Sequence, residues 1–183
     1  MAQARLLHEF ANVNCVYEIM KLEVLMMRIG HSKDVHRLVP NRPLILGGVE
    51  IQHHLGLDGH SDADVLTHVV IEAIIGALAL GDIGKHFPDT DLAYKDANSM
   101  DLLIATKKML DESNYKIGNL DATIYAEQPK MQPHIEAMQE NIANALDIDL
   151  TQVNVKATRG EGMGFIGREE GMGAECVVLL LNK

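Results

Sequence analysis

A long run of periodically spaced apolar residues begins at residue 65. Its apolar residues come in pairs that repeat every four positions, the spacing of a buried helical face, at Val65/Leu66, Val69/Val70, Ala73/Ile74 and Ala77/Leu78. Ser61 precedes this run and Asp64 follows three residues later, an arrangement like a capping box. We predict a helix that Ser61 caps and that ends at Gly81.

Shorter patterns predict the remaining elements. Apolar or alternating runs indicate strands at 27–36, 118–126, 153–157 and 174–181, and a bend or hairpin at 44–51 centred on Gly47-Gly48. Helices are expected over about 99–111 and from Pro133, where Ile135, Met138, Ile142 and Leu146 form one stripe. The stretch 82–96, with Pro88, is predicted to be a loop.

The elements alternate without a repeat or a linker. We therefore expect one compact α/β or α+β domain over residues 27–183. Residues 1–26 form an N-terminal extension with apolar residues at helical intervals, and we expect it to be helical or poorly ordered, with no assigned role.

Composition narrows the classes of ligand. Apolar residues make up 47% of the chain, yet aromatic residues are 4% and Trp is absent, so the core must be aliphatic. The net charge of −10 and the scarcity of aromatic rings argue against nucleic-acid binding. A phosphorylated small molecule is compatible with this charge if a metal ion supplies positive charge locally.

Several features favour a cytoplasmic protein without a membrane partner. No apolar run reaches the ~18 residues of a membrane span. Glu9, Glu18 and Glu23 interrupt the N-terminal apolar stretches, unlike a secretory signal. Cys15 and Cys176 lie far apart in sequence and do not make a disulfide framework.

One carboxylate and two imidazoles form the candidate metal site. Asp34 and His36 are two residues apart, so in an extended segment their side chains point to the same side. His68 lies in the predicted helix, off its apolar stripe. Three N/O ligands with an open fourth position are typical of catalytic zinc. On spacing alone, the alternative to a metal site is that the Asp-x-His pair occurs by chance and that His68 is an ordinary helical residue.

Three further segments suit phosphate or substrate. Residues 158–168 combine Thr158 and Arg159 with glycines whose free amides can hold phosphate, and Glu161 among them suits Mg²⁺. Residues 81–91 suit a substrate loop, and the amides at 130–132 precede a helix that can hold an anionic group. Each segment also has a simpler interpretation. Residues 158–168 would be a flexible glycine loop with a solvated glutamate, residues 81–91 a plain link between helices, and the amides at 130–132 an ordinary helix cap. A serine nucleophile at Ser61 is disfavoured because the side chains of adjacent residues, here His60 and Ser61, rarely face each other.

The candidate segments occur in a characteristic order. They include Arg28-Ile29-Gly30-His31, Asp34-Val35-His36, His60-Ser61-Asp62, His68, Gln128-Pro129-Lys130-Met131, Asn154-Val155-Lys156-Ala157-Thr158 and Gly164-Phe165 through Gly167-Arg168. The most specific part is Gly81-Asp82-Ile83-Gly84-Lys85 followed by Phe87-Pro88-Asp89-Thr90-Asp91. From about Met27 to Leu181 the chain resembles the 2-C-methyl-D-erythritol 2,4-cyclodiphosphate synthase family, which acts in the non-mevalonate route to isoprenoids.

The resemblance implies a fold, an assembly and a reaction. The fold would be α+β, an α/β sandwich with a mixed sheet covered by helices on one face, assembling as a homotrimer with active sites at subunit interfaces. Asp34, His36 and His68 would bind Zn²⁺, and Glu161 would hold Mg²⁺ or Mn²⁺. The enzyme, a phosphorus–oxygen lyase, would convert 4-diphosphocytidyl-2-C-methyl-D-erythritol 2-phosphate to 2-C-methyl-D-erythritol 2,4-cyclodiphosphate and CMP, as the 2-phosphate attacks the β-phosphorus.

The resemblance also implies which residues contact the substrate. The catalytic His60 and Ser61 would line the phosphates, and Asp34 and His36 would also contact the substrate. Asp82, Ile83, Gly84, Phe87, Pro88, Asp89, Thr90 and Asp91 would hold the erythritol portion. The cytidine diphosphate end would meet Ala126, Glu127, Gln128, Pro129, Lys130, Met131, Gln132 and Thr158, and the remaining contacts would be Arg159, Gly160, Glu161, Phe165 and Arg168. Arg168 and Glu170 would lie near a central cavity able to hold an isoprenoid diphosphate.

Three departures from the family pattern matter, and one is the N-terminal extension, which the family pattern does not match. The family often has Thr-Thr-Thr-Glu where this chain has Thr158-Arg159-Gly160-Glu161, so the role of the middle threonine is assigned to no residue, and Arg159 is a candidate to add positive charge. Lys33 stands where an aromatic or apolar residue is common near the central cavity. The alternative function is a trimeric binding protein for isoprenoid diphosphates with impaired catalysis. A zinc phosphohydrolase is a third, disfavoured because no water-activating base adjoins the ligands.

Overall fold

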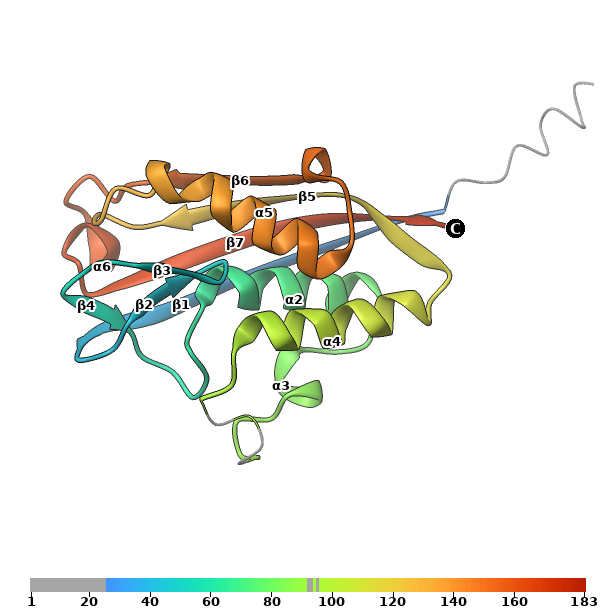
Figure 1. Cartoon of the computed structure of the whole chain (residues 1–183), viewed down its shortest axis with the longest axis horizontal. Coiled ribbons are helices and arrows are strands. Elements are labelled where there is room, and N and C mark those ends of the chain that lie inside the picture. The colour runs from blue at the N-terminus through green and yellow to red at the C-terminus, as the bar shows by residue number, and fades with distance from the viewer. Residues whose placement is uncertain (1–25, 92–93, 95) are drawn as a thin grey trace, which may run out of the picture.

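Residues 26–91, 94 and 96–183 are described by a computed structural model, and they are built around a mixed β-sheet (Figure 1). The strands are β1 (Met27–Pro40), β2 (Leu44–Leu46), β3 (Val49–Ile51), β4 (Leu55–Leu57), β5 (Tyr115–Tyr125), β6 (Val153–Thr158) and β7 (Gly171–Asn182). The five-stranded sheet has the order β4-β1-β7-β5-β6, and β2 pairs with β3 in a separate hairpin. Among the strand pairs of the described residues, β5 and β6 run parallel and the others run antiparallel.

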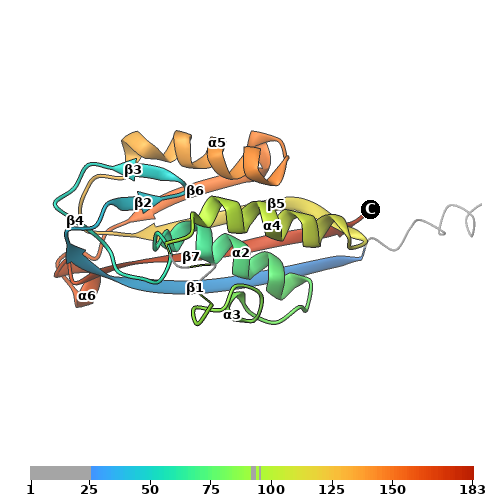
Figure 2. The same ribbon diagram turned by 60° about the horizontal axis from the view of Figure 1, so that its bottom comes forward.

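Helices cover one face of this sheet (Figure 2). They are α2 (Val65–Ala77), α4 (Ser99–Asp111) and α5 (Ile135–Leu146). The structure also has two short helices, α3 (Ile83–His86) and α6 (Gly164–Gly167), and the 3₁₀ turns η2 (Gln132–His134) and η3 (Leu150–Gln152). α2 packs on β1 and β7, α5 packs on β6, and α4 packs against both helices. The expected α+β fold with a mixed sheet and a helical layer on one face is therefore confirmed.

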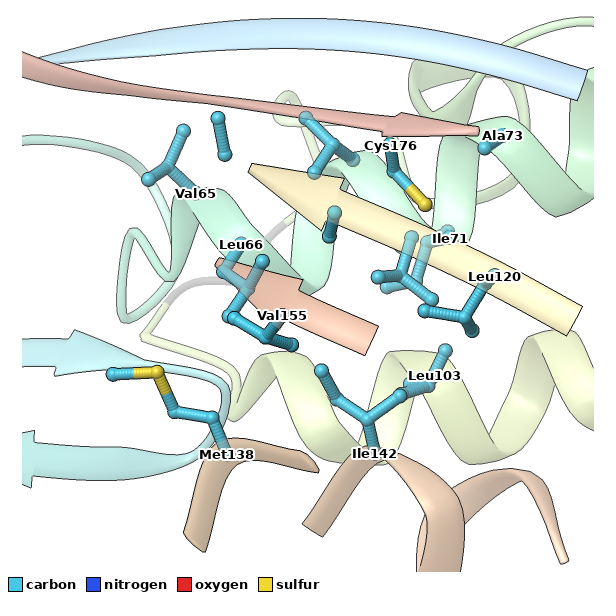
Figure 3. Close-up of a cluster of buried hydrophobic side chains, with 14 of the residues drawn as sticks. Val65, Leu66, Ile71, Ala73, Leu103, Leu120, Met138, Ile142, Val155 and Cys176 are labelled. Carbon is cyan, nitrogen blue, oxygen red and sulfur yellow. The ribbon is translucent and has the colours of Figure 1, made fainter. Parts of the chain in front are cut away.

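The core between the helices and the sheet is aliphatic, as composition predicts (Figure 3). α2 lies at its centre, and nearly all of its side chains are buried. A helix that is apolar around most of its circumference needs partners on several sides, and α2 finds them in the sheet and α4. Leu103 from α4 and Met138 and Ile142 from α5 complete the cluster.

At Gly30 the backbone of β1 comes into contact with α2. A Cβ atom at this position would overlap the carbonyl oxygen of Ala73, so only glycine allows the approach. The helix and the strand thereby hold a fixed spacing. Because Asp34 is on β1 and His68 on α2, this spacing also sets the distance between the two candidate metal ligands.

The predicted start and end of the first helix were wrong. Asp64, not Ser61, is the N-cap of α2, since its carboxylate accepts the Thr67 N–H at 3.0 Å. Ala63 has a φ of 59°, so the backbone is not helical before Asp64. The helix ends at Ala77 rather than at Gly81, because Ala79 also turns left-handed with a φ of 59°.

Other boundaries differ where tertiary pairing extends or interrupts a pattern. β1 continues past His36 to pair with β4, which was not predicted. The presumed loop 82–96 contains α3, and the glycine-rich loop contains α6. β5, β6 and β7 are longer than predicted because β7 pairs along both β1 and β5 and β6 follows β5 to its end. Pro133 lies in η2, and α5 itself begins two residues later. The helix α4 has the predicted bounds.

Within the described part of the chain, no helix has both the length and the hydropathy that crossing a membrane requires. Cys176 is buried, and burial raises the pKa of its thiol to about 12. Cys15 and the predicted N-terminal helix fall in residues 1–25, outside the described residues.

Candidate active site

The three candidate metal ligands converge where β1 meets α2. Asp34 and His36 both point to the helical side of β1, as their spacing predicts, and Nε2 of His36 lies 2.9 Å from Oδ2 of Asp34. His68 on α2 places Nδ1 3.4 Å from the same oxygen. One ligand atom from each residue lies within 4.8 Å of the others. One oxygen and two imidazole nitrogens in this arrangement fit a divalent ion such as zinc, with room for a further ligand.

Hydrogen bonds fix the protonation of His36. Its Nδ1 is 2.6 Å from the carbonyl oxygen of Asp58, which only accepts, so Nδ1 carries a proton and Nε2 faces the ligand triangle. Burial lowers the pKa of His36, but its hydrogen bonds to Asp34 and Asp58 outweigh burial and leave the pKa above its usual value. Burial raises the pKa of Asp34, but its close contacts with the rings of His36 and His68 outweigh burial and hold the pKa well below its usual range. An ionised Asp34 is the form that binds a cation.

The other ring nitrogen of His68 lies against two hydroxyl groups. Its Nε2 is 3.1 Å from Oγ of Ser61 and 3.0 Å from Oγ of Ser99, the first residue of α4. Ser99 in turn donates its hydroxyl proton and its backbone N–H to the carboxylate of Asp62. The His60-Ser61-Asp62 motif therefore lies beside the ligands, although Ser61 does not cap the helix as predicted.

A cavity of about 360 Å³ opens beside the three ligands. We call it the metal-side cavity, and its walls are Asp34, His36, His60, Ser61, His68, Ile83, Gly84, Phe87, Asp89, Tyr94 and Leu102. The structure thus brings the predicted phosphate residues together with part of the predicted erythritol loop. Tyr94 and Leu102 were not predicted. Tyr94 packs edge-on against Phe87 with ring centroids 5.6 Å apart, a contact that no sequence spacing indicates.

A second cavity, of about 540 Å³, lies at the ends of β5 and β6. We call it the strand-end cavity, and it is lined by Ala126, Glu127, Gln128, Pro129, Lys130, Met131, Gln132, Ile135, Val155, Lys156, Ala157, Thr158 and Arg159. Every residue predicted for the cytidine diphosphate end lies in this wall. Four lining residues were not predicted. The parallel pairing of β5 with β6 aligns the carboxyl ends of the two strands and so adds Val155, Lys156 and Ala157, and the start of α5 adds Ile135.

Arg159 is paired within the wall of the strand-end cavity. Its Nη2 donates to Oε1 of Glu127 at 2.7 Å, and the Gly160 N–H donates to Oε2 of the same carboxylate at 3.0 Å. The hydrogen bond from Arg159 lowers the pKa of Glu127. The guanidinium charge is therefore balanced by Glu127, whose side chain is only 10% exposed.

The remaining predicted contacts lie outside the walls of both cavities: Asp82, Pro88, Thr90, Asp91, Gly160, Glu161, Phe165 and Arg168. Asp82 caps α3 by accepting the Lys85 N–H at 2.9 Å. Glu161 is exposed and is not part of the ligand cluster of Asp34. Arg168 donates to Glu170 at 2.8 Å. The two cavities share no lining residue.

Comparison with known proteins agrees with this geometry. A family model, that of the YgbB family, matches residues 27–181. The 2-C-methyl-D-erythritol 2,4-cyclodiphosphate synthase of Clostridium perfringens is 59% identical over 156 residues, which are 85% of this chain and 100% of that protein.

Solved structures show the same fold. The bifunctional IspDF of Campylobacter jejuni is 45% identical with a TM-score of 0.84, covering 87% of this chain and 43% of that longer one. The CDP complex of IspF from Plasmodium falciparum is 32% identical with a TM-score of 0.76, covering 86% of this chain and 97% of that one. The resemblance found in the sequence is confirmed: the chain belongs to the YgbB family, among whose curated relatives are the 2-C-methyl-D-erythritol 2,4-cyclodiphosphate synthases.

Proposed function

We propose that this protein is a cyclase that forms 2-C-methyl-D-erythritol 2,4-cyclodiphosphate in the cytoplasm. An oxygen of the 2-phosphate attacks the β-phosphorus of 4-diphosphocytidyl-2-C-methyl-D-erythritol 2-phosphate, the bond to the α-phosphate oxygen breaks, and CMP leaves. The observation that carries the proposal is the convergence of Asp34, His36 and His68 beside a cavity that also holds His60 and Ser61. The names of its relatives support the cyclase over the binding-protein alternative.

The proposed reaction depends mainly on charge and position. Two anionic phosphates must approach each other, so the site has to neutralise charge and hold both groups in line. A zinc ion on Asp34, His36 and His68, with Mg²⁺ or Mn²⁺ held by Glu161, would supply the positive charge that this acidic chain lacks. His60 and Ser61 line the metal-side cavity and would position the phosphates by donating hydrogen bonds.

We propose that the site is completed in a homotrimer. The predicted cytidine and phosphate contacts lie in two cavities with no lining residue in common, and a second subunit would complete the site by placing its own cavity beside the first. The face of the sheet opposite the helices exposes apolar side chains at Ile29, Val35 and Val177, which are 72%, 50% and 45% exposed. Such a surface is typical of a subunit interface.

From the resemblance we also propose that an isoprenoid diphosphate binds near the threefold axis of the trimer. On the face of the sheet opposite the helices, Nζ of Lys33 lies 2.9 Å from Oε1 of Glu175. A bound diphosphate would therefore have to compete with Glu175 for the Lys33 charge. Arg168 is likewise engaged, with Glu170.

With Mg²⁺ and the proposed substrate, the purified protein is expected to release CMP and form one cyclic diphosphate per CMP. Chromatography would quantify CMP and ³¹P NMR would identify the ring. Treatment with a zinc chelator should stop the reaction and added zinc should restore it, because the metal neutralises the phosphates. Release of inorganic phosphate without a cyclic product would contradict the cyclase assignment.

Replacing Arg159 tests whether its charge aids binding. Arg159→Ala leaves Glu127 unbalanced in the strand-end cavity, where it repels a diphosphate. We expect KM to rise about threefold to tenfold. The rise should be larger at low salt, because salt screens the repulsion between exposed charges. The double variant Arg159→Ala/Glu127→Gln removes the repulsion and should return KM toward that of the wild type.

The matched control is Lys107→Ala, which breaks a similar surface pair with Asp111 outside both cavities. It should leave KM unchanged. A KM that stays constant in Arg159→Ala at low salt would show that the guanidinium has no part in substrate binding.

A further inference from the structure

We propose that Ser99 and Asp62 are positioning residues that decide which nitrogen of His68 faces the metal ion. Neither residue lines the metal-side cavity, so we expect their effect on the metal ion to pass through His68. The proposal rests on the metal site described above and adds the groups that orient one of its ligands.

The direction of the hydrogen bonds follows from Asp62. Its Oδ2 accepts the Ser99 N–H at 2.9 Å, and its Oδ1 accepts the Asp64 N–H at 3.2 Å together with the Ser99 hydroxyl. An ionised carboxylate only accepts, so the single hydroxyl proton of Ser99 is committed to Asp62. Ser99 Oγ can then only accept from the group 3.0 Å away, which is Nε2 of His68.

This polarity selects one tautomer of His68. Nε2 carries the proton, and Nδ1 is left with its lone pair. Nδ1 is the atom that lies 3.4 Å from Oδ2 of Asp34 in the ligand triangle. The hydrogen bonds from His68 to Ser99 and from Ser99 to Asp62 therefore leave an unprotonated nitrogen for the ion. In many metal-bound histidines a carboxylate or carbonyl group has the same role as Ser99.

Ser61 is the competing acceptor, and it is the weaker candidate. Its Oγ lies 3.1 Å from the same Nε2 and already accepts the Ala63 N–H at 3.2 Å. Among the described residues no carboxylate accepts the hydroxyl proton of Ser61, and Ser61 lines the metal-side cavity, where a phosphate would compete for this hydroxyl. Ser99, in contrast, is fully buried.

The backbone holds this arrangement in place. The Asp62 N–H donates to the Ala97 carbonyl at 3.1 Å, and the Asp96 N–H donates to the His60 carbonyl at 2.9 Å. These two bonds join the loop before α2 to the segment before α4. Ser99 thus reaches His68 from an element that is distant in sequence but fixed in space.

Zinc affinity of Ser99→Ala tests the proposal directly. This variant removes the hydroxyl but keeps the backbone N–H that bonds to Asp62, so the contact between the loop and α4 survives. We expect the Kd for zinc, measured by competition with a chromophoric chelator, to rise about tenfold or more. The matched control is Ser113→Ala at the other end of α4, where the hydroxyl bonds to the Leu110 carbonyl, and its Kd should equal that of the wild type.

Asp62→Asn is the second variant and reverses the polarity. The amide has one oxygen for two backbone donors. When this oxygen accepts the Ser99 N–H, the amide NH₂ faces Ser99 Oγ, the bond from the Asp64 N–H is lost, and the Ser99 hydroxyl proton turns toward Nε2 of His68. The Kd should again rise about tenfold or more, because Nδ1 must now lose a proton before it binds zinc. Circular dichroism and the thermal midpoint report whether the variants remain folded.

A spectroscopic measurement separates orientation from a merely structural role. In the zinc-loaded wild type, ¹H–¹⁵N NMR of labelled histidines should show His68 protonated at Nε2, with His68→Gln used to assign the signals. Coordination through Nε2, or a Ser99→Ala Kd within twofold of the wild type, would overturn the assignment of Ser99 and Asp62. A wild type without zinc affinity would overturn the metal site itself, and the Ser99 assignment with it.

Discussion

His68→Ala is expected to lower zinc binding and CMP release together. The variant removes one of three protein ligands, and the two that remain, Asp34 and His36, both come from β1 and hold the ion from one side only. Loss of an outer partner alone weakens metal binding by about 10- to 100-fold, so loss of a ligand should cost at least 100-fold in affinity. Without charge neutralisation at the phosphates, the rate should fall by about a thousandfold or more.

Metal content by mass spectrometry and the CMP assay would be measured on the same sample. His54→Ala is the matched control, because it removes an exposed imidazole that contacts His53 and not the ligands. Urea titration of both variants would show whether the fold is intact. Full zinc occupancy in His68→Ala would mean that another residue is the third ligand.

The ligand triangle could be predicted because each of its parts follows from a local rule. Two residues two apart on a strand share a face, and Asp34 and His36 lie on β1 as expected. The four-residue period of α2 marks its buried face, and it places His68 off the apolar stripe. What spacing alone did not supply was the approach of α2 to β1, which depends on Gly30 against Ala73.

Contacts between distant segments could not be predicted from the sequence. Ser61 and Asp64 both have side chains suited to capping, and only the left-handed turn at Ala63 decides between them. The pairing of Arg159 with Glu127 joins residues 32 positions apart, and that of Ser99 with His68 joins residues 31 apart. A period in the sequence identifies the buried face of one element but not the neighbour that this face meets.

Asp64→Ala is expected to cause a large loss of stability. The carboxylate is fully buried and accepts four hydrogen bonds, from the backbone N–H of Gly47, Gly48 and Thr67 and from the Thr67 hydroxyl. Burial raises the pKa of Asp64, and the four hydrogen bonds oppose that shift. Alanine would leave the buried donors without an acceptor, which costs far more than the bonds themselves contribute.

This carboxylate also joins two elements, since it caps α2 and holds the turn of the β2–β3 hairpin. We expect Asp64→Ala to lower the free energy of unfolding by about 3–5 kcal/mol, a large part of the roughly 5–15 kcal/mol of a typical domain. Urea titration would measure the loss, and Asp64→Asn should lose about half as much because its oxygen keeps some of the donors.

Asn98→Ala is the control that isolates ordinary capping. Asn98 caps α4 with a single exposed bond to the Met100 N–H at 2.9 Å, so its loss should cost only about 1 kcal/mol. A cost for Asp64→Ala no greater than for Asn98→Ala would show that the hairpin turn is held by something other than this carboxylate. If the larger cost is found, the start of α2, and with it the position of His68, depends on a buried charge whose partners all donate to it.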